Sequence, residues 1–360
     1  MPKIDALFDA LIAKGGSDLH IAVGHPPLAR VRGELVPLVE GDVSAKDLEE
    51  LLVEPLGQAQ RARLRTDLDV EFAFNHADVG RFRASYCFKA GGLGAVFRLI
   101  PLRVPTLAEL ALPEVIWRFA DKRAGLVVIA GRRASGRTAT AGAIVDHVNK
   151  TRACNILTIE EPIELVHEPH RAQITQREVG IHAPSFATAL RAAAREMVDV
   201  VFVSELRTDD AVKAALTLAS SGVLVLTTSP SATAFGALDR LVALADEVER
   251  PTVRSLLADV LTGVVAQQLV RTVDGKNRVA VHEILLGSET LSEILREGKG
   301  SDVVALMESG KSQGMATMEG ALEKLLAAGR ISPETGFEAA NDKEAFAKVL
   351  SRLRPDVDIP

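Results

Sequence analysis

The stretch from Gly131 to Thr138 (GRRASGRT) constrains this chain more than any other. It follows a short apolar run, 125–130 (GLVVIA), which is typical of a buried strand, and it precedes an alanine-rich segment, 138–149, which is typical of a helix. A glycine-bounded loop between a strand and a helix suits phosphate binding, because backbone N–H groups and the helix N-terminus then face an anion. The spacing therefore predicts a phosphate-binding loop on an α/β fold.

The loop fits the pattern G-x-x-x-x-G-K-[ST] at every required position but one. Gly131, Gly136 and Thr138 match, whereas Arg137 stands where the pattern has lysine. Arginine keeps the charge, but its planar guanidinium is larger than an ammonium and donates in different directions. We expect the loop backbone from Ser135 and the Thr138 hydroxyl to bind phosphate and Mg²⁺, and Arg137 to contact the phosphates less well. The alternative is a chance glycine loop between a strand and a helix.

Composition sets the class of protein. A chain of 360 residues with 47% apolar and 25% charged residues is ordinary for one or two globular domains. The formal net charge of −6 gives no reason to expect nucleic-acid binding. Cys87 and Cys154 have no C-x-x-C partner, which excludes a cysteine zinc site. The sequence has no apolar run of about 18 residues and no signal-peptide layout at its N-terminus, so we expect a cytoplasmic protein.

Residues 1–102 are expected to form a small α+β domain. Residues 1–14 have the spacing of an amphipathic helix, and Ser44 is expected to cap a second helix. A hairpin is predicted at 30–38, and three alternating runs between 67 and 100 (DVEFAF, RFRASYCF, GAVFRLI) predict an antiparallel meander. Arg81, Arg83 and Arg98 interrupt these strands and could meet phosphate or simply cover apolar surface. His20 and His25 are interpreted as structural rather than metal-binding residues.

Residues 103–112 are expected to be a linker, and 113–360 an α/β domain with a helical C-terminal part. Strands and helices alternate here, which indicates βαβ units and a mainly parallel sheet. After residue 250 the chain is predicted to be mostly helical, at 251–270, 291–297, 302–309 and 317–328. The expected strands are 125–130, 155–160, 199–203, 223–228 and 279–284, and the expected helices between them are 138–149, 185–196, 209–220 and 233–244.

Two glutamates end strands of this predicted sheet. Glu160 follows NILTI, and Glu205 follows DVVFVS. In a parallel sheet such strand ends lie at the same edge as the phosphate loop, where ligands bind. A carboxylate at this edge can orient water for attack on a γ-phosphate or hold Mg²⁺ through its water shell. The alternative is ordinary capping and ion pairing.

Several longer stretches resemble the retraction-ATPase (PilT-like) branch of the type II/type IV secretion ATPases, which power type IV pili and twitching motility. TIEEPIELVH (158–167) resembles the family's Asp box, and LRAAAREMVDVVFVSELR (190–207) resembles its Walker B segment. QREVG (176–180) also matches, and the likeness runs from SDLH (17–20) to GMATMEGAL (314–322). RFRASYCF and GAVFRLIP resemble the arginine-bearing strands of the family's N-terminal domain.

The resemblance implies a fold, a ligand and an assembly. It implies an N-terminal PAS-like α+β domain joined to a RecA-like ATPase domain, and a homohexameric ring that binds ATP and Mg²⁺ between the two. It makes Glu160 and Glu205 the catalytic glutamates, and Arg83 and Arg98 the phosphate-contacting arginines. Arg81 is a third candidate. It also implies a place at the inner membrane, beside an inner-membrane pilus platform protein, with a paralogous ATPase as a possible partner.

The chain departs from the family pattern around one nucleotide site. Besides Arg137, Glu161 stands in place of the aspartate of the Asp box, and Ser204 in place of the glycine before the Walker B glutamate. GVLVLTTSPS (222–231) has Val223 and Pro230 where the family's His box has histidines, and the retraction motif is reduced to TLSEILRE (290–297). We therefore expect ATP binding with impaired hydrolysis. The alternatives are a fully working motor and an inactive nucleotide-binding or structural partner of a competent ATPase.

Overall fold

The computed structural model describes residues 3–31, 33–76, 80–100 and 103–354. It divides into two compact units. The first contains the N-terminal residues up to Arg103 together with Glu161–Val166, and the second contains Val104–Glu160 and the residues from His167 onward. The short segment Glu161–Val166 thus groups with the first unit, although the sequence analysis assigned it to the ATPase domain. In the second unit Leu107 and Leu112, from the expected linker, pack into a buried core.

In its described residues the first unit forms a six-stranded antiparallel sheet with the order β3-β2-β1-β6-β5-β4. Every second residue of β5 from Gly80 to Tyr86 is buried, because a sheet covered on one face alternates buried and solvent-facing side chains. Ser44 begins α2 and accepts a hydrogen bond from the Asp47 N–H, as predicted. The elements are α1 (Lys3–Ala13), β1 (Asp18–Ala22), β2 (Leu28–Val31), β3 (Glu34–Pro37), α2 (Ala45–Val53), α3 (Gln58–Asp67), β4 (Asp69–His76), β5 (Gly80–Lys89) and β6 (Gly92–Ile100).

In its described residues the second unit contains a seven-stranded sheet with the order β13-β12-β7-β11-β10-β8-β9. All its neighbouring strands are parallel except the β12–β13 pair. Helices join the central strands, as the alternating pattern predicted. The elements are α4 (Glu114–Trp117), β7 (Gly125–Ala130), α5 (Arg137–Thr151), β8 (Asn155–Glu160), β9 (Gln173–Glu178), α6 (Phe186–Ala193), β10 (Val200–Val203), α7 (Asp209–Ser220), β11 (Leu224–Ser229), α8 (Ala234–Ala243), α9 (Arg250–Val260), β12 (Leu261–Arg271) and β13 (Arg278–Leu286).

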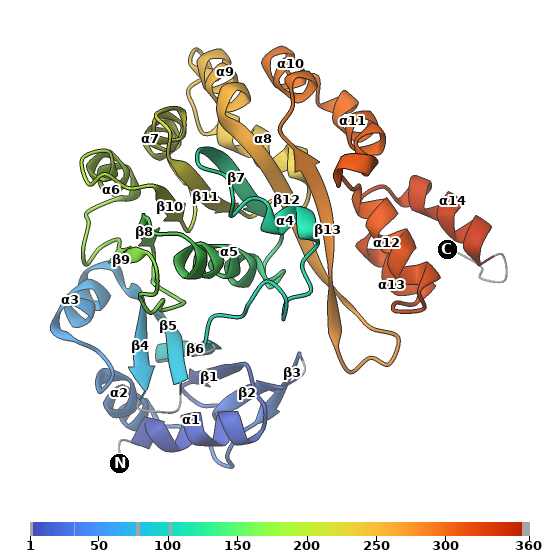
Figure 1. Cartoon of the computed structure of the whole chain (residues 1–360). Coiled ribbons are helices and arrows are strands. Elements are labelled where there is room, and N and C mark those ends of the chain that lie inside the picture. Colours follow the sequence, from blue (N-terminus) through green and yellow to red (C-terminus); the bar gives the residue numbers. More distant parts are fainter. Residues whose placement is uncertain (1–2, 32, 77–79, 101–102, 355–360) are drawn as a thin grey trace. The chain divides into compact units, whose positions relative to one another are not determined.

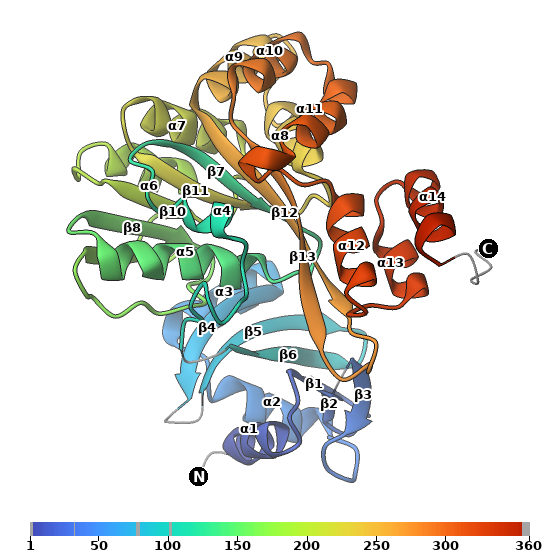
Figure 2. The same cartoon turned by 45° about the vertical axis from the view of Figure 1, so that its right-hand side comes forward.

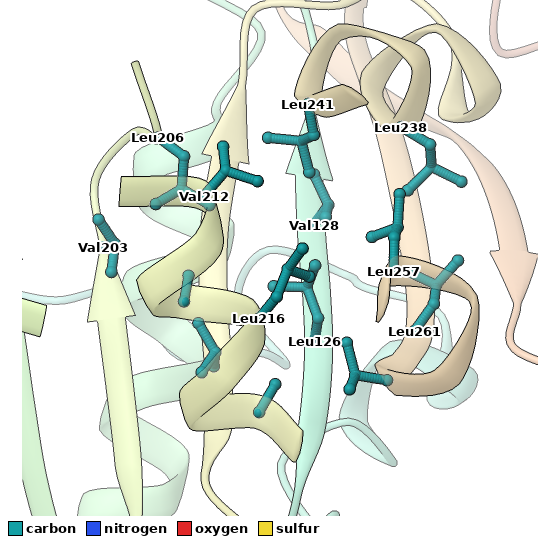
Figure 3. Close-up of a cluster of buried hydrophobic side chains, with 14 of the residues drawn as sticks. Leu126, Val128, Val203, Leu206, Val212, Leu216, Leu238, Leu241, Leu257 and Leu261 are labelled. Atoms are coloured by element: carbon teal, nitrogen blue, oxygen red, sulfur yellow. The ribbon is translucent and has the colours of Figure 1, made fainter. Parts of the chain in front are cut away.

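Helices cover both faces of this sheet, so its central strands are buried on both sides. Figure 1 shows α5 on one face and α6 and α7 on the other, in agreement with the two separate buried clusters. Figure 3 shows how the second face is filled: Leu126 and Val128 of β7 point toward Leu216 of α7 and Leu241 of α8. Burial on two sides explains why the strands read as continuous apolar runs in the sequence.

The prediction that 251–270 is helical was wrong for its second half. The helix α9 ends at Val260, and the chain continues as the long strand β12 beside β7. β12 is buried on both faces, so it has no period-two alternation, and a short apolar run of this kind cannot be distinguished from a buried helix by periodicity. At Gly263 the strand packs tightly on Phe119, because a Cβ there would lie 2.7 Å from the Phe119 ring.

The C-terminal part of the second unit is helical, as predicted for 291–297, 302–309 and 317–328. Figure 2 shows α12, α13 and α14 beside the β12–β13 ribbon, where Met318, Leu322 and Phe346 pack on Val270 and Val281. No helix among the described residues is both long and apolar enough to cross a membrane. The elements are α10 (Glu289–Glu297), α11 (Val303–Ser309), α12 (Met318–Ala327), α13 (Pro333–Ala339) and α14 (Lys343–Leu353), with short 3₁₀ turns at Gly300–Asp302 and Lys311–Gln313.

Candidate nucleotide site

The phosphate loop joins β7 directly to α5, as the sequence predicted. The Gly131 N–H donates to the Ser229 carbonyl at 3.0 Å, so the loop starts at the end of the neighbouring strand β11. Gly136 caps α5 with φ 88°. A Cβ at Gly131 would lie 2.2 Å from Ser135 Oγ, and one at Gly136 would lie 2.7 Å from Gln267 Nε2. Both positions therefore require glycine, for backbone conformation and for space.

The residues of this loop fit a phosphate group. Ser135 is 5% exposed, and its hydroxyl has no hydrogen-bond partner in the described part of the chain. Buried hydroxyls are usually satisfied, so one left without a partner inside a glycine loop suits an oxyanion ligand. Arg137 and Thr138 are the first two residues of α5 and are half-buried. The helix N-terminus adds a partial positive charge at this point.

Gln267 of β12 is a residue of this site that the sequence analysis missed. Its side-chain amide donates to the Ser135 carbonyl at 2.7 Å and accepts from the Thr140 hydroxyl at 2.7 Å. Gln267 is 3% exposed. A glutamine inside an apolar run was the available signal, because a buried amide needs partners, but the run had been interpreted as helix.

Glu160 and Glu205 lie at the same edge of the sheet as the loop, because β7, β10 and β8 are parallel and in register. Neighbouring strands are about 4.8 Å apart, so β10, two places from β7, ends about 10 Å from the loop, and β8 ends about 14 Å from it. The structure thus brings both glutamates to the expected edge, with Glu205 two residues beyond the end of the nearer strand β10.

The two glutamates have different surroundings. Glu160 is buried, and it accepts hydrogen bonds from the Thr158 hydroxyl at 2.7 Å and the Gln176 amide at 3.2 Å. Glu205 is half-buried, with Arg207 Nε at 3.3 Å and Arg240 Nη2 at 3.9 Å. Glu160 thus accepts from two neutral side chains on β8 and β9, whereas Glu205 is paired with cations and partly open to water.

The strand end next to the loop is polar and uncharged. Thr228 Oγ1 donates to the Ser204 carbonyl at 2.6 Å, and this bond joins β11 to the end of β10. The hydroxyls of Ser204, Thr227 and Ser229 are buried without a hydrogen-bond partner in the described residues. Pro230 follows at the exposed end of β11 and has no N–H to donate. The sequence from Leu224 to Ser231 contains no charged residue.

Arg83 and Arg98 lie in the first unit, directly opposite each other on β5 and β6. Arg83 contacts Glu71 at 2.5 Å and Glu164 at 2.6 Å, and Arg98 Nε contacts Asp18 at 2.7 Å. Burial alone would lower the pKa of Arg83, but the carboxylates of Glu71 and Glu164 outweigh this effect and raise the pKa. Both guanidiniums are thus presented on one face of the sheet, each already paired with acid.

Asp18 itself is nearly buried. Burial pushes its pKa up, but hydrogen bonds from Ser17 and Arg98 outweigh this and hold the pKa below its ordinary value. Arg81, the third candidate, donates from Nε and Nη2 to the Ile163 carbonyl and from Nη1 to Asn75. Its contacts are those of a residue that anchors the segment Glu161–Val166 within the first unit.

His20 and His25 belong to no group of potential metal ligands in the described part of the chain. No cluster of three or more His, Cys, Asp or Glu side chains is arranged to hold a metal within the described ranges. Cys87 and Cys154 are free thiols.

Residues 2–308 match the family model of the type II/IV secretion system proteins. The chain is 37% identical to the type IV pilus retraction ATPase PilT of Pseudomonas aeruginosa, over 92% of this chain and 96% of that protein. It is 33% identical to the type IV pilus ATPase PilU of the same organism, over 98% and 94% of the two chains. A crystal structure of the pilus retraction motor PilT with bound ADP superimposes with a TM-score of 0.85 at 32% identity, covering 97% of this chain and 99% of that one. The α/β fold predicted from the sequence is thereby confirmed, and the chain belongs to the type II/IV secretion system protein family.

Proposed function

We propose that this chain is an ATPase of the pilus retraction type that binds ATP at the Gly131–Thr138 loop and hydrolyses it slowly. The observation that carries the proposal is the loop itself, with two obligate glycines and a buried Ser135 hydroxyl, just before α5, that has no hydrogen-bond partner among the described residues. The relative with bound ADP supports nucleotide as the ligand.

Each candidate residue has a role in this proposal. The loop backbone from Ser135 and the charge of Arg137 bind phosphate, and the Thr138 hydroxyl is a ligand for Mg²⁺, which neutralises phosphate charge. Glu205, which is partly open to water, orients the attacking water, and the buried Glu160 fixes the hydrogen-bond network behind it. Arg83 and Arg98 supply charge to the γ-phosphate in the manner of arginine fingers.

Slow hydrolysis follows from which parts of the site have changed. Phosphoryl transfer depends on positioned charge around the γ-phosphate, and removing one preorganised donor commonly lowers the rate by about 10²–10³-fold. Arg137 alters one such group and Pro230 removes another, whereas Glu160 and Glu205 remain. We therefore expect turnover well below the ordinary enzyme range of about 1 s⁻¹ and above.

A second candidate function is a nucleotide-binding or structural partner of a competent paralogue, within or beside a homohexameric ring at the inner-membrane pilus platform. Two relatives in one organism, PilT and PilU, support it, since both are similar to this chain over nearly its whole length. In this case the chain contributes to the ring and binds nucleotide, and its own ATP hydrolysis is not required.

The test restores the two altered positions. ATP turnover of the native chain is compared with Arg137→Lys combined with Pro230→His, and with Glu205→Gln as the inactive reference. Arg132→Lys is the matched control, because Arg132 is an exposed arginine of the same loop. We expect a rise of at least about 10²-fold on restoration and none in the control. Native turnover at about 1 s⁻¹ or faster would overturn the impaired site, and a native chain that binds ATP with no turnover would favour the structural partner.

A further inference from the structure

Gln267 connects the phosphate loop to a strand outside the β7–loop–α5 unit. Its amide holds two atoms on either side of the helix start, the Ser135 carbonyl and the Thr140 hydroxyl, each at 2.7 Å. Ala266 is in register with Ala130, the last residue of β7, so Gln267 lies beside the point where the loop leaves the sheet. A Cβ at Gly131 would lie 2.5 Å from the Gln267 carbonyl oxygen, and this value indicates how closely β12 approaches the loop.

We propose that Gln267 is a positioning residue that fixes the conformation of the phosphate loop for nucleotide binding. This inference rests on the proposed function of the loop as a nucleotide site. Gln267 is assigned no direct contact with the ligand: its amide donates to the Ser135 carbonyl and accepts from the Thr140 hydroxyl, both within the protein. It acts through Ser135, whose carbonyl it holds and whose hydroxyl remains without a partner among the described residues.

The chemistry of the contact requires an amide. Ser135 offers an acceptor and Thr140 a donor, so the side chain between them must donate at one end and accept at the other. A carboxylate lacks the donor, and methionine, of similar length, lacks both. Because the site is buried, losing either bond leaves a polar group unsatisfied, and the loop must shift to reach another partner.

Gln268, the next residue of β12, provides a matched control. Its amide donates to the Ala339 carbonyl at the end of α13, at 3.1 Å, away from the loop. Gln267→Met and Gln268→Met therefore each remove a glutamine amide from the same strand. A purely structural role for Gln267 predicts that both variants lose stability and neither changes the loop.

Two measurements on the full-length protein test the proposal. The first is hydrogen–deuterium exchange of the loop segment 131–138 in the nucleotide-free protein. The second is calorimetric affinity for a non-hydrolysable ATP analogue with Mg²⁺. For Gln267→Met we expect faster loop exchange and an affinity loss on the order of tenfold or more, and for Gln268→Met neither change. Equal behaviour of the two variants in both measurements overturns the proposal.

Variants of Thr140 test the same hydrogen bond without changing Gln267, and so remain informative if Gln267→Met does not fold. Thr140→Ser keeps the hydroxyl donor to Gln267 but removes a buried methyl, whereas Thr140→Val keeps the shape and removes the donor. We expect Thr140→Ser to keep the native affinity despite lower stability, and Thr140→Val to lose affinity. The reverse order contradicts the positioning role. If the native chain itself binds no nucleotide, the proposed function fails, and the exchange rates still decide whether Gln267 holds the loop.

Discussion

Replacing Gly136 with alanine should weaken nucleotide binding far more than its single added methyl group suggests. Gly136 caps α5 in a left-handed conformation, with φ 88° and ψ 14°, at the centre of the phosphate loop. The Gln267 amide also occupies the space that a side chain at position 136 would need, since a Cβ there would lie 2.7 Å from Gln267 Nε2. The substitution therefore imposes two separate costs on the loop conformation.

The magnitude follows from these two costs. A left-handed conformation costs an alanine about 1–2 kcal/mol. Moving the Gln267 amide away breaks its bond to the Ser135 carbonyl, which contributes about 1 kcal/mol. The sum of about 2–3 kcal/mol corresponds to an affinity lower by about 30- to 150-fold, at about 1.4 kcal/mol for each factor of ten.

Gly222→Ala is the control for the backbone cost alone. Gly222 also has a left-handed φ, of 103°, but no atom of the described residues lies within 4 Å of its hypothetical Cβ, and it precedes β11 at the opposite end of the sheet from the loop. Calorimetry with an ATP analogue and urea unfolding would be run on both variants. Gly222→Ala should lose stability and keep its affinity. Native-like nucleotide affinity in Gly136→Ala would refute the reasoning, because the loop would then not need the observed conformation.

Three further outcomes are expected. Ala134 is exposed with φ 61°, a left-handed conformation that costs an alanine about 1–2 kcal/mol. Ala134→Gly should therefore relieve that cost in urea unfolding, whereas Ala134→Val, a β-branched residue, should lower the unfolding free energy further although it removes no contact. Arg98→Ala should weaken binding of an ATP analogue if this guanidinium reaches phosphate, and unchanged affinity and turnover would make it purely the partner of Asp18. Burial lowers the pKa of His282 to about 4. Below pH 6.5 this imidazole therefore binds a proton in the unfolded chain but stays neutral in the folded chain until the pH approaches 4. The unfolding free energy should therefore fall by about 1.4 kcal/mol per pH unit for this group between pH 6.5 and 4, and His282→Gln should remove that part of the slope measured by urea titration at pH 7 and 5.5.

The sequence was informative where glycines and caps mark the ends of elements. The strand–loop–helix around Gly131–Thr138 was predictable because a short apolar run, two glycines and an alanine-rich segment have few other arrangements. Glu160 and Glu205 were predictable for a topological reason: the carboxyl ends of parallel strands meet at one edge whatever the side chains between them. The helix after Ser44 was also predictable, because its capping hydrogen bond from the Asp47 N–H to the Ser44 hydroxyl is local in sequence.

What the sequence could not supply were partners from distant parts of the chain. β9 is a polar edge strand, QITQRE, which pairs in parallel with β8 and has little apolar patterning of its own. The acids that hold the arginines could not be identified from the sequence either. Asp18 contacts Arg98 from the neighbouring strand β1, and Glu164 contacts Arg83 from the segment Glu161–Val166, which follows β8 in the sequence. Gln267 belongs to the same class, since its partners lie more than a hundred positions away in sequence.

The altered positions, Arg137 and Pro230, are expected to affect ATP hydrolysis more than ATP binding. Binding by this kind of loop depends chiefly on backbone N–H groups and on the helix N-terminus, and these require the glycines at 131 and 136, which are present with no room for any side chain. Hydrolysis depends on side chains that place charge at the γ-phosphate, and those are what differ, at Arg137 beside the loop and at Pro230 on the adjacent strand end. We therefore expect a chain altered in this way to keep the loop conformation that binds nucleotide and to hydrolyse ATP slowly. Restoring the side chains without touching the loop backbone is therefore the experiment that distinguishes a slow motor from a ring component that only senses nucleotide.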